Sequence, residues 1–449
     1  MGVTTTLTKQ RERDTPAAPA TATGAPRQSS RDPYLDLVRA WAILRVVLVH
    51  ILGTAPVAML WWPAPTFVAP GMPLVFFVSG ALAAKSLGSS GRSSTTLGFW
   101  HDRFRRLLLP YWAFLLVPVT MALVLDATHR GDLYTVSYAR TVLAFVPFID
   151  PITSPMGFNG VVHLWFLVVI AWMMLLAPGL VWLHRRVPWL LLAGALAFWW
   201  GTAWRSEHDH AFVFAEVSAA ALFMFFFVLG FWYTDGKLVS GVVPHDRGGP
   251  SPGRGALDGW RGLVAGAFAI GASWLVWQWE HPLAVQASIA VHGLLGLGWL
   301  CWILAARPGL VRVAQSIPRL LNLITRRTLT IYLWGWPCAA LAAWAVNDRG
   351  LPTPVALGLF LLIAIGGLAV VVVVFGPVED FAARRRGGRQ RTRAAAGTSG
   401  TSGTGEASAT SGGRDQAHPR VAGVPPASTP TLGPWSQLRS ESSTPASVD

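Results

Sequence analysis

The chain has 449 residues, of which 52% are hydrophobic and only 13% are charged, about half the charged fraction of an ordinary soluble domain. It contains 23 Trp and 22 Phe, and its mean hydropathy is +0.44. This composition excludes a soluble globular enzyme, a disulfide scaffold and a disordered protein. The net charge of +14 raises the question of nucleic-acid binding, which depends on where the basic residues lie.

Ten apolar segments are long enough to cross a bilayer, for which about 20 residues are needed. Because backbone groups in lipid must be paired internally, segments of this length are expected to be helices. The first segment is longer than the apolar core of a cleaved signal peptide, so we expect it to be retained. The sequence therefore predicts an all-α, polytopic membrane helix bundle with spans near 34–54, 70–86, 107–125, 161–183, 187–204, 211–234, 261–279, 283–306, 327–347 and 353–376.

The basic residues divide unequally between the two sides of such a bundle. The loops that follow even-numbered spans hold 16 Lys and Arg when Lys85, Arg261 and Arg327 at the span ends are counted with them, whereas the loops that follow odd-numbered spans hold 4. The positive-inside rule then places both termini in the cytoplasm. The positive charge is therefore a topology signal that predicts a multi-pass protein of the plasma membrane, and no nucleic-acid partner is expected.

The composition also divides the chain into three regions. Residues 1–33 are polar and are expected to form a disordered cytoplasmic tail. Residues 34–376 hold the ten apolar segments and form the predicted transmembrane domain. Residues 377–449 begin with a run of arginines and continue as a Gly, Ser, Thr, Ala and Pro low-complexity region, which predicts a second disordered cytoplasmic tail.

The first span carries a dense set of ionisable residues: Asp36, Arg39, Arg45 and His50. Arg39 and His50 are eleven residues apart, which places them on nearly the same helix face with a rise of about 16 Å between them. Asp36 lies one turn before Arg39 and can pair with it. A neutral buried imidazole can act as a general base for a hydroxyl nucleophile, although a hydrogen-bonded His inside the bundle explains the same spacing.

A second cluster, His101–Arg106, precedes the third span. Arg103 and Arg106 have the i, i+3 spacing that places two guanidinium groups on one helix face. Such a pair can grip phosphate oxygens. The alternative is a cluster of charges that only sets the topology of the third span.

Other ionisable residues carry weaker signals. His163 opens the fourth span and Glu216 lies inside the sixth; either can be a hydrogen-bonded group of the bundle. Cys301 and Cys338 lie in apolar runs without a Cys or His companion at metal-ligand spacing, so no metal site is predicted.

Five short motifs, taken in order, resemble the acyltransferase-3 family of integral membrane O-acyltransferases. The first span runs from Leu35-Asp36-Leu37-Val38-Arg39 to His50. The later motifs are Phe76-Phe77-Val78-Ser79-Gly80, then Arg103-Phe104-Arg105-Arg106 with Leu109-Pro110, then His163-Leu164-Trp165-Phe166-Leu167, and finally Thr330-Ile331-Tyr332-Leu333-Trp334-Gly335-Trp336-Pro337. The ordered set covers residues 34 to about 376.

The resemblance implies a role for several of these residues. His50 would be the catalytic group that activates the acceptor, and Arg39, Arg103 and Arg106 would bind the acyl-CoA donor. Asp36, His163, Glu216 and Tyr332 are accessory candidates. Gly335 departs from the family, which usually has His there. Some relatives carry a hydrolase-like domain after the membrane part, and the last region here is too poor in hydrophobic residues to form one.

The resemblance implies a membrane O-acyltransferase that moves an acyl group, expected to be acetyl, from acyl-CoA to a hydroxyl. The acceptor is a carbohydrate, a cell-envelope glycan or a secreted metabolite. No bound cofactor is expected, since acyl-CoA is a co-substrate. Two alternatives remain open: a transporter or exporter of a small or lipid-linked solute, and a non-catalytic membrane scaffold. Whether His50 acts as a general base or forms an acyl-histidine is also open.

Overall fold

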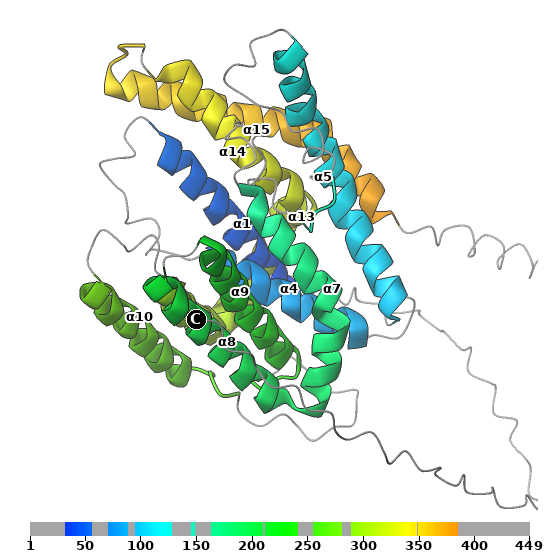
Figure 1. Cartoon of the computed structure of the whole chain (residues 1–449), viewed down its shortest axis with the longest axis vertical. Coiled ribbons are helices and arrows are strands. Elements are labelled where there is room, and N and C mark those ends of the chain that lie inside the picture. Colours follow the sequence, from blue (N-terminus) through cyan, green and yellow to red (C-terminus); the bar gives the residue numbers. More distant parts are fainter. Residues whose placement is uncertain are drawn as a thin grey trace, which may run out of the picture. The chain divides into compact units, whose positions relative to one another are not determined.

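A computed structural model describes residues 32–55, 71–88, 95–127, 145–148, 163–209, 212–240, 255–280, 289–347 and 349–384. Within these ranges the secondary structure is helical, with no strand (Figure 1). The helices are α1 (Pro33–Thr54), α4 (Gly71–Gly88), α5 (Thr96–Ala127), α7 (Trp165–Arg186), α8 (Pro188–Asp209), α9 (Phe212–Thr234), α10 (Trp260–Glu280), α11 (Ile289–Ala305), α12 (Arg307–Ser316), α13 (Pro318–Arg326), α14 (Thr328–Val346) and α15 (Thr353–Ala383).

Each of the ten expected segments overlaps one of these helices, and two helices extend furthest beyond their expected segments. Helix α5 begins at Thr96 instead of 107, so the arginine motif lies inside the helix. Helix α15 continues through Pro377 to Ala383 instead of ending at 376. Two short helices, α12 and α13, lie in the expected loop between the eighth and ninth segments, and each begins with a proline in its first two positions, where proline is tolerated.

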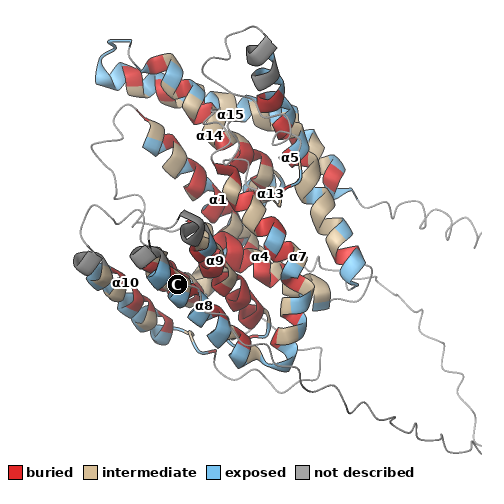
Figure 2. Cartoon of the chain, in the orientation of Figure 1, coloured by how far each residue is buried: buried red, intermediate tan, exposed pale blue. Residues whose placement is uncertain are grey.

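Six of the described helices are long and apolar enough to cross a membrane: α4, α5, α7, α9, α14 and α15. Helices α11 and α12, which meet at a bend of 72°, make a seventh if they form one span. The helical, membrane-spanning character of the chain is thus confirmed, and the number of ten spans stays a prediction. Burial differs strongly among these helices (Figure 2): 72% of the apolar window of α9 is buried, against 11% in α15.

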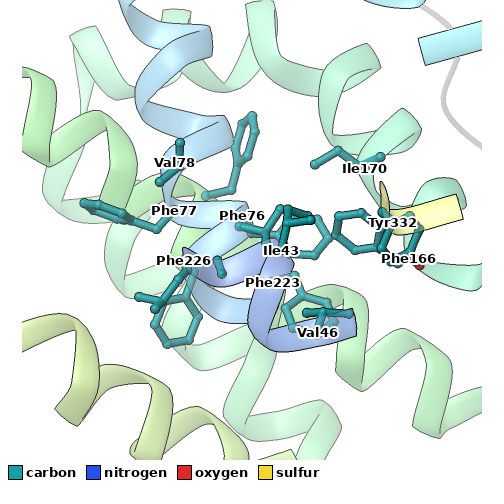
Figure 3. Close-up of a cluster of buried hydrophobic side chains, with 14 of the residues drawn as sticks. Ile43, Val46, Phe76, Phe77, Val78, Phe166, Ile170, Phe223, Phe226 and Tyr332 are labelled. Carbon is teal, nitrogen blue, oxygen red and sulfur yellow. The ribbon is translucent and has the colours of Figure 1, made fainter. Parts of the chain in front are cut away.

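The centre of the bundle is an aromatic cluster (Figure 3). The Phe76 ring of α4 stacks on Phe223 of α9, with 4.5 Å between centroids, and meets Phe166 of α7 edge to face at 5.2 Å. Tyr332 of α14 lies 4.9 Å from the Phe166 ring. Aromatic pairs of this geometry contribute about 0.5–1.5 kcal/mol beyond the area they bury, so four helices are joined at this point.

Two glycines allow α4 and α9 to cross in backbone contact. A Cβ on Gly80 would lie 2.0 Å from the Phe227 carbonyl oxygen, and a Cβ on Gly230 would lie 2.3 Å from the Phe77 carbonyl oxygen. Small residues at helix crossings let backbones approach in membranes, where packing has to replace the hydrophobic effect. This crossing fixes the Phe76 and Phe77 side chains against the neighbouring helices.

Helices α1 and α14 run side by side in the same direction (Figure 1). Arg39 pairs with Thr328 near the start of both helices, Val47 packs on Gly335 further along, and His50 meets Trp336 beyond that. We call this contact the α1–α14 seam. It aligns the charged residues of α1 with the first half of α14.

Replacing Gly80 by Ala is expected to destabilise the protein, because the added Cβ overlaps the α9 backbone and forces the helices apart. Overpacking of this kind costs about 1–3 kcal/mol. The thermal midpoint in detergent, measured by loss of the monodisperse peak, should fall by several degrees. Gly194→Ala in α8 is the control, since nothing lies within 4 Å of its added Cβ. Equal midpoints for the two variants would contradict the crossing.

Candidate functional site

Three arginines from two helices gather at one end of the bundle, and we call them the arginine cluster: Arg39, Arg103 and Arg106. Arg39 of α1 donates a hydrogen bond from Nη2 to Thr328 Oγ1 at 2.8 Å. Arg103 of α5 donates from Nη2 to the Leu82 carbonyl of α4 at 3.0 Å. The charges of Arg39 and Arg106 both act on Arg103. The structure therefore brings together the three arginines that the sequence singled out.

The members of the arginine cluster differ in exposure. Arg103 is partly enclosed and lies over the Phe99 ring, with Cζ 5.5 Å from its centroid, whereas Arg106 is exposed. Like charges held near one another repel, so an anion placed among them is favoured. Guanidinium groups present fixed donors that suit phosphate oxygens.

The first turn of α14 is clamped by side chains from α1 and α15. Glu379 of α15 accepts hydrogen bonds from the Leu329 backbone N–H at 3.0 Å and from Thr330 Oγ1 at 2.8 Å. Arg39 binds the hydroxyl of Thr328, the first residue of α14. The bond to Leu329 satisfies a backbone donor at the helix start that lacks a partner in the helix itself. Together the three bonds hold the start of α14 against Arg39 and α15.

The last turns of α15 are tied down by two further arginines. Arg327 pairs with Asp380, with 2.6 Å between Nη2 and Oδ2, and also donates to the Gly376 carbonyl. Arg105 of α5 donates to the Phe381 and Arg384 carbonyls at 2.8 and 2.7 Å. The assignment of these residues to a disordered tail beginning at 377 is therefore wrong up to Ala383. Glu379 was missed for the same reason. Its signal in the sequence is a pair of carboxylates, Glu379 and Asp380, about one turn after the apolar segment that ends at 376.

Further along the seam, His50 and His163 lie close together in an aromatic setting, and we call them the histidine pair. The half-buried His50 ring meets Trp336 edge to face, with 5.2 Å between centroids, and His163 at 6.4 Å. His163 is 3% exposed. Phe114 of α5 and Tyr332 of α14 border its ring at 5.9 and 5.4 Å.

A proline in α14 explains how His163 is held. In a helix the Leu333 carbonyl normally accepts from the N–H four residues later, but that residue is Pro337, which has none. His163 Nε2 donates to this carbonyl instead, at 2.9 Å. The Tyr332 hydroxyl donates in turn to the His163 carbonyl. Pro337 was part of a recognised motif, but its effect four residues earlier was not foreseen.

The absence of a side chain at Gly335 is explained by the packing of α14 on α1. A Cβ at this position would lie 2.8 Å from Val47 Cγ2 and 3.4 Å from Val47 Cβ. A larger side chain fits here only if Val47 shifts, so glycine lets α1 and α14 approach closely. The imidazole that relatives usually carry here is thus replaced by a close contact between the two helices that bear Arg39 and His50.

The remaining predicted site residues fall in different places. Asp36 is half-buried on α1, one turn before Arg39. Tyr332 is buried and holds the backbone at His163. Glu216 belongs to α9, but its side chain lies outside the described residues. Within the described ranges, no group of three or more His, Cys, Asp or Glu residues is placed to hold a metal ion.

Arg39 of the arginine cluster and His50 of the histidine pair lie at different levels of α1. Arg39 and His50 are eleven residues apart on α1, a rise of about 16 Å. The arginine cluster can hold an anionic group, and the histidine pair offers an imidazole in a largely apolar setting. A ligand that joins a charged end to a reactive end through a long arm fits this separation.

Comparison with known proteins assigns the chain to a family. Residues 32–376, well over half of the chain, match the acyltransferase-3 family, which is described as an acyltransferase domain. The matched region begins at the residue before α1 and ends inside α15. No curated protein and no solved structure matches the chain. The resemblance seen in the sequence motifs is thereby confirmed.

Proposed function

Because the chain belongs to the acyltransferase-3 family, and is therefore a membrane acyltransferase, we propose that it moves an acyl group, most simply acetyl, from acyl-CoA to a hydroxyl. The acceptor in this proposal is a carbohydrate, a cell-envelope glycan or a secreted metabolite. The observation that carries the proposal is the α1–α14 seam, which has the arginine cluster at one end and His50 further along.

The donor side of the proposal rests on the arginine cluster. Coenzyme A carries its phosphates at one end and its thioester at the other, separated by the flexible pantetheine arm. Arg39, Arg103 and Arg106 are assigned to the phosphates, because guanidinium groups bind phosphate through fixed pairs of donors. The thioester then reaches along the seam toward His50, about 16 Å away on α1.

The acceptor side rests on His50. In the proposed step, the neutral imidazole takes the proton of the acceptor hydroxyl while the hydroxyl oxygen attacks the thioester carbonyl. The new C–O bond forms, the C–S bond breaks, and the proton passes from His50 to the leaving CoA thiolate. Positioned general-base catalysis of this kind contributes about 10²–10⁴-fold to the rate.

The membrane orientation follows from the same assignment. Acyl-CoA is a cytosolic compound, so the arginine cluster is placed at the cytoplasmic face of the plasma membrane. The N-terminal end of α1 and the C-terminal end of α15 then face the cytoplasm, which agrees with the excess of Lys and Arg in the loops on that side. The proposal includes ten membrane spans. It also places the acceptor hydroxyl near His50, deeper in the bundle than the arginine cluster.

His50→Ala is expected to abolish acyl transfer while the protein still inserts, because the variant lacks the group that takes the hydroxyl proton. The assay uses membrane vesicles from cells that naturally make the protein, so the native acceptor is present, and follows label from [¹⁴C]acetyl-CoA. Loss of at least about 100-fold is expected. His101→Ala is the control, since this exposed histidine belongs neither to the arginine cluster nor to the histidine pair. Near-normal transfer by His50→Ala would overturn the role given to His50.

Arg103→Gln and Arg106→Gln are expected to raise the acetyl-CoA concentration needed for half-maximal transfer by about 10- to 100-fold, the effect of losing one charge-assisted hydrogen bond. In the same vesicles, Arg186→Gln serves as control, because Arg186 stacks on Trp182 at the end of α7. Should the donor requirement stay unchanged in both cluster variants, these arginines would only set the topology.

A further inference from the structure

One ring nitrogen of His163 makes a hydrogen bond, and the other has no partner among the described residues. The Leu333 carbonyl can only accept, so His163 Nε2 carries the hydrogen in their 2.9 Å bond. Nδ1 is then the acceptor nitrogen of a neutral imidazole. Nδ1 is buried and has no hydrogen-bond partner among the described residues. A buried acceptor without a hydrogen-bond partner lowers the stability of the folded protein by about 1–3 kcal/mol. The presence of such an acceptor at His163 points to a partner that binds it at another stage of the reaction.

The His50 ring is the polar group that faces His163. The two rings meet at 63° with 6.4 Å between centroids. Among the described residues, the Phe114 and Tyr332 rings also border His163, and the Tyr332 hydroxyl is already bound to the His163 carbonyl. Neither ring nitrogen of His50 has a hydrogen-bond partner in the part of the chain that the structure describes.

We propose that His163 is a positioning residue for His50: its Nδ1 accepts a hydrogen bond from a His50 ring N–H while His50 holds the hydroxyl proton. This inference rests on the proposed function. Bases in nucleophilic enzymes are commonly oriented by a third group of this kind, and contacts that are long in the free enzyme often shorten in the reacting complex. His163 never takes the proton, which still passes from His50 to the CoA thiolate.

The α14 backbone makes this assignment specific. Because Pro337 frees the Leu333 carbonyl, the Nε2–H of His163 is held by the helix, and the ring cannot turn Nε2 toward His50 without breaking that bond. The same helix contributes Trp336, which contacts the His50 ring at 5.2 Å. One turn of α14 therefore contacts both imidazoles.

Two substitutions separate the two nitrogens of His163. His163→Gln places an amide near Nε2, so it keeps a donor for Leu333 but loses the acceptor near Nδ1. His163→Asn places its amide near Nδ1, so it keeps the acceptor but loses the bond to Leu333. Both variants are assayed in native membrane vesicles with [¹⁴C]acetyl-CoA, normalised to the amount of folded protein, beside the wild type and His50→Ala.

The maximal rate of His163→Gln is expected to fall by about 10- to 100-fold, with the half-saturating acetyl-CoA concentration and the thermal midpoint unchanged. His163→Asn is expected to keep a maximal rate within a few-fold of wild type at a lower thermal midpoint. A purely structural His163 gives the reverse order, with Gln active and Asn impaired, and that result overturns the inference. Equal rates for both variants, or failure of His163→Gln to fold, overturn it as well.

The controls keep this inference apart from the proposed function. Transfer that occurs in wild-type vesicles and is lost in His50→Ala sustains the function, so an unfavourable order of the two His163 variants then counts against the positioning role alone. Absence of transfer from acetyl-CoA in wild-type vesicles, or its persistence in His50→Ala, counts against the proposed function itself and removes the basis of the positioning role.

Discussion

The close approach of α1 and α14 at Val47 and Gly335 is the contact on which the rest of the site depends. Because Gly335 has no side chain, the two helices meet in the register that pairs Arg39 with Thr328 and His50 with Trp336. The Arg39 guanidinium and the His50 imidazole are thereby held at different levels of the same helix pair. In a membrane, where packing replaces the hydrophobic effect, such small-residue contacts are a main source of helix association.

Hydrogen bonds that the helices cannot make themselves provide the second level of order. Pro337 frees the Leu333 carbonyl for His163, and Pro178 likewise frees the Met174 carbonyl, which accepts from Trp100 Nε1 at 3.2 Å. At the start of α14, Glu379 supplies the missing acceptors. Unpaired backbone groups are costly in lipid, so each of these side chains has a defined partner, and the helices are joined at specific points.

The sequence was sufficient for the parts of this account that depend on local pattern. Apolar length predicted the helices. The ionisable residues of the first span indicated Arg39 and His50, which lie along the seam, and the arginine motif before the third span indicated Arg103 and Arg106, which belong to α5. The roles of these residues stay predictions. The clamp by Glu379 could not be predicted, because it joins residues about fifty positions apart and lies beyond a proline that ends the apolar pattern. The bond between His163 and Leu333 required knowing which helices are neighbours.

The measurement that tests the seam most directly is disulfide formation between Val47→Cys and Gly335→Cys in a chain whose native Cys301 and Cys338 are replaced by Ala. A Cβ at 335 lies 3.4 Å from Val47 Cβ, close to the Cβ separation of disulfides, about 3.5–4.5 Å. Rapid cross-linking of this pair under mild oxidation in membranes is expected, seen as linked peptides by mass spectrometry. Leu48→Cys paired with Gly335→Cys is the control, because Leu48 faces away from the protein with 52% of its surface exposed, and no cross-link is expected. Absence of the 47–335 cross-link, or equal cross-linking of the control pair, would contradict the register of α1 and α14 and with it the placement of the site.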